Sequence, residues 1–234
     1  MIAFDIRFYD SLGSTQDEAR RLAQAGARHG TVVTALEQTA GRGRLGRYWA
    51  SPAGNVYLSV VLRLELPRVV ELGFVAALAV ADTVDAYLPG RATLKWPNDV
   101  LVDGGKISGI LIEHVDAAAI IGIGLNVLHV PERTPYPVTS LGALHAAAEV
   151  DAARELLLDA LARRLDAWRS EGFARVRADW LRRAHPSGTR LHVTSPDRDI
   201  EGHFVGLADD GALLLDAAGG VRRLLVGDVS VRVG

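Results

Sequence analysis

The segment at residues 41–49, GRGRLGRYW, restricts the fold more than any other part of this sequence. Its glycines at positions 41, 43 and 46 match the G-x-G-x-x-G spacing of a dinucleotide-binding turn. Such a turn needs a strand before it and a helix after it, because the pyrophosphate lies at the helix N-terminus. The β-branched residues 31–38 predict the preceding strand, but Pro52, Gly54 and a second β-branched run at 55–66 follow the loop. The sequence therefore predicts a strand–loop–strand unit and argues against a dinucleotide-binding βαβ unit.

The arginines of this loop, Arg42, Arg44 and Arg47, leave three interpretations open. Arginine–glycine segments with aromatic residues bind single-stranded nucleic acid, but they are usually longer and repeated. A solvated surface loop is the simplest alternative. Arginine also makes bidentate contacts with phosphate and carboxylate groups, and glycine lets a backbone fold over a ligand. On the residues alone, a loop that binds an anion such as phosphate and a solvated surface loop are about equally favoured. No P-loop motif occurs anywhere in the sequence.

Composition places the chain among ordinary globular proteins. It has 234 residues, of which 49% are hydrophobic, and a formal net charge of −2. This length allows one large domain or two unequal ones, and any anion site must be local because the whole chain is not basic. The sequence contains no cysteine, which excludes disulfides and thiolate metal sites. No segment has the pattern of a membrane span or a signal peptide, so we expect a cytoplasmic protein.

Periodicity predicts both helices and strands, with a change of pattern near residue 187. Thr15 and Glu18 fit a capping box at the start of the first helix. Helices are predicted from this box to near Gly26, over 69–88, from Asp151 onward, and in a shorter segment before Pro186. Extended segments are predicted over 31–38, 55–66, 92–102, 106–115 and 119–130. Short strands with tight turns follow residue 187, so we divide the chain into 1–187 and 188–234 and expect the smaller part to dock on the larger.

Several motifs in one order resemble the biotin protein ligase family. They are GSTQ (13–16), EQTAGRGRLGRYWASPAGNVYLSV (37–60), KWPNDV (95–100), GKISGILIE (105–113), GIGLNV (122–127), GALLLD (211–216) and GDVSVR (227–232). The ordered set covers most of the chain and is highly specific, although any single motif could arise by chance. The resemblance implies an α+β fold, with a mixed sheet and flanking helices similar to class II aminoacyl-tRNA synthetases, over 1–187. It also implies a small SH3-like β-barrel over 188–234.

The resemblance implies an ATP-dependent ligase that works in two steps. The carboxylate of biotin attacks the α-phosphate of ATP to give biotinyl-5′-AMP and pyrophosphate, and a lysine of a carrier protein then takes the biotin. Positive groups must offset the repulsion between the two anions of the first step. The resemblance assigns catalytic roles to Lys106, Arg42 and Arg44, with Lys106 bridging the biotin carboxylate and the α-phosphate. Without the resemblance, Lys106 is best interpreted as a solvated hairpin lysine.

The same resemblance predicts where biotin binds. Its ureido ring is neutral and needs both donors and acceptors when it is buried. The predicted biotin-binding residues are Ser14, Thr15, Gln16, Gln38, Gly41, Arg42, Gly43, Arg44, Lys106 and Gly109. Ser14 and Thr15 could also cap the first helix, which is compatible with binding. Gln16 stands where many relatives carry asparagine.

The predicted adenylate-binding residues come from several motifs. They are Arg42, Arg44, Trp49, Asn98, Lys106, Asn126, Asp228 and Arg232. Trp49 resembles an aromatic lid over the adenylate, with a core tryptophan as the alternative, and Asn98 with Asp99 also suits a simple turn after Pro97. The histidines show no metal-ligand spacing, so we predict no metal site made by protein ligands. The Mg²⁺ that accompanies ATP would be held mainly by phosphates.

The resemblance also implies the partners. Biotin and ATP are the expected small molecules, and the expected protein is the biotin carboxyl carrier domain of a biotin-dependent carboxylase. GSTQ begins at Gly13, which leaves no room before it for a helix-turn-helix domain, so we predict a monofunctional ligase that does not bind DNA. Family members dimerise by pairing sheet edges, and an open edge could do the same here.

Two alternatives to biotin ligation remain at this point. A lipoate–protein ligase would share the fold, but the polar ureido-binding set and the arginine loop favour biotin. A non-catalytic nucleotide- or RNA-binding module is the second alternative, and Lys106 beside the arginine loop argues against it.

Overall fold

The computed structural model describes the chain except for residues 1, 65–68, 132–133, 195–198, 226 and 232–234. Its helices are α1 (Thr15–Gln24), α2 (Glu71–Tyr87), α3 (Val150–Glu171) and α4 (Phe173–Leu181). The larger sheet contains β1 (Asp5–Leu12), β2 (Thr31–Gln38), β3 (Val56–Arg63), β4 (Ala92–Lys95), β5 (Asp99–Val102), β6 (Gly105–Val115) and β7 (Ala118–Leu125). The smaller sheet contains β8 (Arg190–Thr194), β9 (Asp199–Leu207), β10 (Leu213–Ala217), β11 (Gly220–Leu224) and β12 (Asp228–Val231).

The seven-stranded sheet is mixed, which confirms the predicted fold class. Its strand order is β1-β2-β3-β7-β6-β5-β4. β1 and β2 are parallel, whereas every other neighbouring pair is antiparallel. β1 was not predicted from the sequence, although Phe4, Ile6 and Phe8 alternate with Asp5 and Arg7 as in a strand. Because β1 lies at an edge, this alternation does not mark a buried face, and Ile6 and Phe8 are about half exposed.

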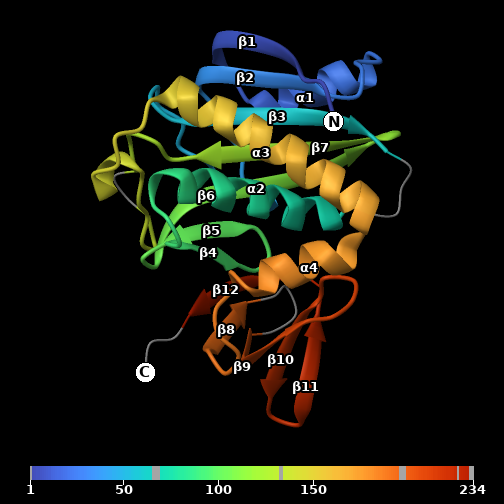
Figure 1. The fold of residues 1–234 in the computed structure, drawn as a ribbon, viewed down its shortest axis with the longest axis vertical. Coiled ribbons are helices and arrows are strands. Elements are labelled where there is room, and N and C mark those ends of the chain that lie inside the picture. The colour runs from blue at the N-terminus through green and yellow to red at the C-terminus, as the bar shows by residue number, and fades with distance from the viewer. Residues whose placement is uncertain (1, 65–68, 132–133, 195–198, 226, 232–234) are drawn as a thin grey trace.

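Helices cover both faces of the larger sheet (Figure 1). α2 and α3 cross one face, and α2 is buried on almost all sides because it lies between the sheet and α3. This burial explains why the apolar run at 69–88 has no polar stripe. α1 covers part of the opposite face, where Leu22 belongs to a small core cluster with Val33, Val61 and Ile120.

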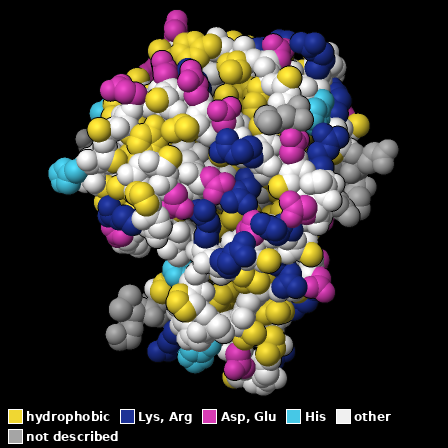
Figure 2. Space-filling view, in the orientation of Figure 1, with side chains coloured by type: hydrophobic (Ala, Val, Ile, Leu, Met, Phe, Trp, Pro, Cys, Tyr) yellow, Lys and Arg dark blue, Asp and Glu magenta, His cyan; other side chains and the backbone are white. Residues whose placement is uncertain are grey.

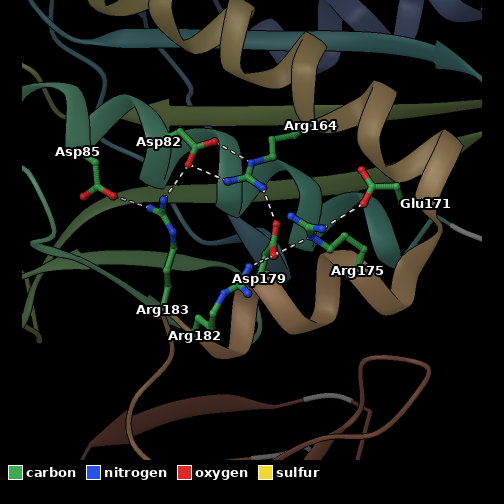
Figure 3. Close-up of polar contacts among 8 residues, drawn as sticks. All are labelled: Asp82, Asp85, Arg164, Glu171, Arg175, Asp179, Arg182 and Arg183. Atoms are coloured by element: carbon green, nitrogen blue, oxygen red, sulfur yellow. Dashed lines mark hydrogen bonds and ion pairs between the residues drawn. The ribbon is translucent and has the colours of Figure 1, made fainter.

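A network of charged side chains joins α2, α3 and α4 (Figure 3). Arg164 of α3 lies 2.6 Å from Asp82 of α2 and 2.8 Å from Asp179 of α4. Arg183 follows α4 and reaches back to α2, at 2.9 Å from Asp82 and 2.7 Å from Asp85. The three helices therefore form one layer linked by ion pairs, and the chain that leaves α4 is anchored to α2.

The smaller sheet has the order β11-β10-β9-β8-β12 and lies below the larger sheet in Figure 1. Within the described residues its edge strands β11 and β12 are not paired with each other, so the SH3-like barrel is not closed. Two side chains of the larger part donate to backbone carbonyls of the smaller part, one in the turn between β9 and β10 and one in β12. Trp96 Nε1 donates to the carbonyl of Gly211 at 3.1 Å, and Lys95 Nζ donates to that of Val229 at 3.0 Å.

The helical face of the molecule carries both signs of charge (Figure 2). Lys and Arg side chains lie among Asp and Glu side chains on this face, and neither sign dominates it. The helices that the structure describes include none that is long and apolar enough to cross a membrane.

Candidate active site

A cavity of about 680 Å³ lies between the larger sheet and β12. Its floor is the side of the sheet that α1 only partly covers. Along β7, the residues on this side change from Ala118 and Ile120, which pack near α1, to Gly122 and Gly124, which line the cavity. The glycines leave space that larger side chains would fill. One strand therefore supports a helix with its first half and forms the floor of a small-molecule site with its second half.

Neutral polar side chains meet at one end of this cavity. The hydroxyl of Ser14 accepts the N–H of Gln16 at 3.2 Å, so the N-cap of α1 is Ser14 and not Thr15 as the capping box predicts. Gln38 Oε1 accepts from Thr15 N at 2.8 Å and from Thr15 Oγ1 at 3.1 Å. The hydroxyl of Ser59 lies 3.0 Å from both Thr15 Oγ1 and Gln16 Oε1. All five side chains are buried and line the cavity, so they form a pocket of paired donors and acceptors.

The arginine loop closes the cavity against the smaller sheet. Arg47 Nη2 lies 2.5 Å from Asp228 Oδ2, and Arg44 Nη1 lies 3.6 Å from Asp228 Oδ1. Arg44 also donates to Asn98 Oδ1 at 3.0 Å. Burial lowers the pKa of the Arg44 guanidinium, while Asp228 opposes this shift. Arginine stays protonated in proteins, so Arg44 brings a partly buried positive charge to the cavity.

Both lysines of the sequence contact the same carboxylate. Lys95 Nζ lies 2.8 Å from Asp99 Oδ2, and Lys106 Nζ lies 2.6 Å from Asp99 Oδ1. Burial alone would raise the pKa of the Asp99 carboxyl, but the attraction of Lys106 and Lys95 outweighs it and holds that pKa below its ordinary value. Two ammonium groups around one carboxylate leave this end of the cavity with excess positive charge, which suits an anionic ligand.

Trp49 lies over the glycine floor. A Cβ atom at Gly124 would lie 2.5 Å from Trp49 Nε1, and one at Gly109 would lie 3.0 Å from the ring. The indole also contacts Lys106, whose Nζ is 5.3 Å from the ring centroid. Trp49 Nε1 is buried and has no hydrogen-bond acceptor among the described residues. The side chain therefore covers the cavity and is not part of the hydrophobic core.

The structure brings most of the predicted site residues together. The ones that line the cavity are Ser14, Thr15, Gln16, Gln38, Arg42, Gly43, Arg44, Trp49, Asn98, Lys106, Gly109 and Asp228. Gly41 does not line it but packs closely, since a Cβ there would lie 2.4 Å from the carbonyl oxygen of Trp49. Asn126 does not line it either, because its amide donates to the carbonyl of Thr139 at 3.0 Å and supports the backbone. Arg232 lies outside the described residues.

The cavity also contains residues outside the predicted set, and three polar ones among them are informative. Ser59 is a polar residue inside the apolar strand β3, and this break in the pattern is a signal that could have found it. Lys95 belongs to the KWPNDV motif, but only the structure places it beside Asp99. Tyr136, whose ring centroid is 5.4 Å from Lys106 Nζ, comes from a proline-containing loop and carries no sequence signal.

The fold and the cavity define a class of protein. Neutral donors and acceptors occupy one end, lysine and arginine side chains occupy the other, and a tryptophan covers the floor between them. A ligand that fits has a neutral polar head and a negatively charged group near its other end. On a mixed sheet of the kind that the motifs imply, these features fit the class of enzymes that join a carboxylate to a nucleotide phosphate.

Comparisons with known proteins identify the family. Residues 9–126 match the biotin/lipoate A/B protein ligase family, and residues 187–232 match the biotin protein ligase C-terminal domain. The biotin–[acetyl-CoA-carboxylase] ligase of Paracoccus denitrificans is 38% identical over 88% of this chain and 92% of its own. The corresponding Mycobacterium tuberculosis ligase is 38% identical over 93% of this chain and 85% of its own. The structure of Aquifex aeolicus biotin protein ligase in complex with biotin and ATP superposes with a TM-score of 0.87 at 28% identity, covering 97% of this chain and 98% of that one.

This chain belongs to the biotin protein ligase family. The family and the fold class predicted from the ordered motifs are confirmed.

Proposed function

We propose that this cavity carries out both steps of ATP-dependent biotin ligation. The chain is a ligase that forms biotinyl-5′-AMP and transfers biotin to a lysine of a biotin carboxyl carrier protein, with biotin and ATP as its substrates. One observation supports the residue roles most directly: the neutral polar pocket and both lysines of the sequence line the same cavity. We divide the chain into a catalytic part, 1–187, and a part at 188–234 that contributes Asp228 to the cavity wall.

In the first step, a carboxylate oxygen of biotin attacks the α-phosphorus of ATP, and the bond to the bridging oxygen of pyrophosphate breaks. Ser14, Thr15, Gln16 and Gln38 hold the ureido ring in this proposal. Lys106 and Arg44 lie where negative charge must be offset as the two anions approach, and such preorganised charge acts strongly where water is excluded. When the phosphate binds, the Lys106 ammonium contacts it, either together with Asp99 or in place of Asp99.

In the second step, the neutral amine of the carrier lysine attacks the carbonyl carbon of the adenylate. The bond from this carbon to the phosphate oxygen breaks, AMP leaves with the electron pair, and the new amide nitrogen loses its extra proton. The two lysines of this chain are both ion-paired with Asp99, with side chains 20% and 14% exposed. In a transfer assay, we therefore expect biotin to be attached to the carrier lysine, with little attached to the lysines of the ligase itself.

Mg²⁺ is expected to enter with ATP. Within the described residues, no group of three or more His, Cys, Asp or Glu side chains could hold a metal ion. Asp99 contacts both lysines and would supply one oxygen ligand to such an ion, with phosphate oxygens and water as the others. The residues present thus fit a metal carried mainly by the nucleotide, where it would neutralise phosphate charge.

Biotin-dependent ATP–pyrophosphate exchange tests the proposal directly. Purified protein with Mg²⁺ should exchange labelled pyrophosphate into ATP when biotin is added and not when lipoate is added. The match of residues 187–232 to the biotin protein ligase C-terminal domain supports biotin over lipoate. Exchange with lipoate alone would assign the chain to lipoate ligation. A folded protein that exchanges with neither acid would support the non-catalytic alternative.

Three finer expectations belong to this proposal. β1 is an edge strand with mostly exposed residues, so two copies could pair through it, and a monomer at all concentrations in sedimentation experiments would refute this. The described α-helices all pack against the larger sheet or against α2, so we also expect no DNA binding, which a gel shift can check. A cysteine-free chain that uses ATP fits a cytoplasmic location, which fractionation can test.

Substitution of Trp49 by alanine is expected to weaken nucleotide binding. Stacking of a base on an aromatic side chain contributes about 1–3 kcal/mol, so KM for ATP in the exchange reaction should rise roughly tenfold. The biotin affinity measured without ATP should change much less. Trp49→Phe keeps an aromatic face and should retain most of the affinity. A W49A enzyme with unchanged KM for ATP would mean that the indole only covers the empty floor.

A further inference from the structure

We infer that Glu113 is a positioning residue that couples the pocket for the biotin head to the arginine loop. Glu113 lies near the end of β6 and does not line the cavity, so it acts through its neighbours. The inference rests on the proposed function, because it assigns a role in biotin binding to a residue outside the cavity.

Donors from three positions converge on the Glu113 carboxylate. Oε2 accepts from Gln16 Nε2 at 3.1 Å, and Oε1 accepts from Arg20 Nη2 at 2.6 Å. Arg42 Nη2 lies 3.2 Å from Oε1 and 3.4 Å from Oε2. Gln16 and Arg42 line the cavity, the first in the head pocket and the second in the arginine loop. One carboxylate therefore contacts both halves of the site from behind.

Glu113 determines which end of the Gln16 amide faces which neighbour. The other contact of this amide is Ser59, whose hydroxyl can donate or accept and also contacts Thr15. Ser59 alone is therefore compatible with either amide orientation. A carboxylate only accepts, so Glu113 requires the Gln16 NH₂ to point toward it and leaves the carbonyl oxygen toward Ser59 and the cavity floor. A Cβ at Gly122 would lie 2.4 Å from this oxygen, which shows how closely the amide rests on the floor.

Arg42 receives its position from two carboxylates. Its Nη2 lies 2.7 Å from Asp17 of α1, in addition to the contact with Glu113 of β6. The Arg42 side chain is about one-third exposed, so neither pair alone holds it strongly. Their combination ties the arginine loop to the start of α1 and to β6. A substitution of Glu113 should therefore alter side-chain positions at both ends of the cavity.

The test is a double-mutant cycle on Gln16 and Glu113, read by biotin Kd from calorimetry without ATP. Glu113→Gln keeps the size of the side chain but allows it to donate as well as accept, so the Gln16 orientation is no longer specified. We expect biotin Kd to rise roughly tenfold, as for loss of a hydrogen bond to a charged group. Gln16→Asn shortens the amide away from Glu113 and should have a similar effect. The double variant should be little worse than either single variant, because both remove the same coupling.

Exchange kinetics supply the second readout. In Glu113→Gln, kcat should also fall severalfold because Arg42 loses a partner, whereas Gln16→Asn should change mainly KM for biotin. Glu113→Asp keeps an acceptor-only group and should recover part of both losses. Glu18→Gln is the matched control, because Glu18 is on the same helix as Gln16 but does not line the cavity. Its carboxylate accepts from Arg21 of α1 and from Tyr9 of β1. This control should stay within about twofold of wild type, as expected for a surface pair.

Two outcomes would overturn the coupling. One is a biotin Kd for Glu113→Gln within twofold of wild type. The other is additive effects of Gln16→Asn and Glu113→Gln, which would assign Glu113 a purely structural role. Failure of the proposed function looks different: wild type would then show no biotin-dependent exchange, and non-additive shifts in biotin Kd would still support the coupling.

Discussion

Replacement of Lys106 by alanine is expected to lower kcat for biotin-dependent ATP–pyrophosphate exchange by about 10²–10³-fold, the typical loss when one group that stabilises transition-state charge is removed. The Lys106 ammonium is partly buried, lies 2.6 Å from Asp99 and sits below the Trp49 ring. Its charge matters most when the biotin carboxylate and the α-phosphate approach each other. Biotin alone carries a single negative charge at this end, so its Kd should change much less than kcat.

Lys95 offers the matched comparison for this experiment. It is the other lysine of the sequence and contacts the same Asp99 carboxylate, but it also donates to the backbone of Val229 in the smaller sheet. Lys95→Ala removes an equal charge from Asp99, so a loss that arises only from a disturbed Asp99 should appear in both variants. A much larger loss of kcat in Lys106→Ala would support direct contact with the reacting groups. Equal losses in biotin affinity and in kcat for Lys106→Ala would instead mean that Lys106 acts in ground-state binding.

The elements that carry the apolar core could be predicted from the sequence, because burial imposes a pattern on it. β2 has the predicted bounds, 31–38. The helix predicted over 69–88 is α2, which begins at Glu71 and ends at Tyr87. Elements whose residues are mostly exposed could not be predicted in the same way. β1 is an edge strand whose alternating Ile6 and Phe8 are about half exposed, and no motif indicates its parallel pairing with β2.

The motifs predicted which residue types form the candidate site, but they did not predict which side chains contact one another. The motifs place arginines, lysines and small polar residues in one order along the chain, yet the contacts of Asp99 with both lysines and of Glu113 with Gln16 join distant segments. Such contacts depend on strand order and on side-chain direction, and the order of motifs along a chain reveals neither. Asn126 illustrates the converse: it lies in a family motif, but its amide supports the backbone outside the cavity.

Substitution of Asp179 by alanine should destabilise the helical layer more than any change to a single exposed charge. Asp179 is buried, with 7% of its surface exposed, and contacts Arg164 at 2.8 Å, Arg175 at 3.0 Å and Arg182. Removal of one partner from a buried ion pair typically costs about 3–5 kcal/mol. We expect a smaller loss in the free energy of unfolding, about 2–3 kcal/mol, because the exposed partners Arg175 and Arg182 can return to water.

Urea unfolding measures the free energy of unfolding of Asp179→Ala and of a control variant on the neighbouring helix α3. Thermal unfolding is a second measurement, in which a loss of about 2–3 kcal/mol should lower the melting temperature by roughly 5–10 °C for a chain of this size. Asp151→Ala removes the exposed partner of Arg154 on α3, a pair 2.8 Å apart, and should cost less than about 0.5 kcal/mol. Asp179→Asn keeps the shape and one acceptor and should fall between the two. If Asp179→Ala unfolds at the wild-type urea concentration, Arg164 is adequately satisfied by Asp82 alone. Packing of Phe173 and Trp180 against Phe74 of α2 would then hold α4 in the helical layer, and charge would contribute little.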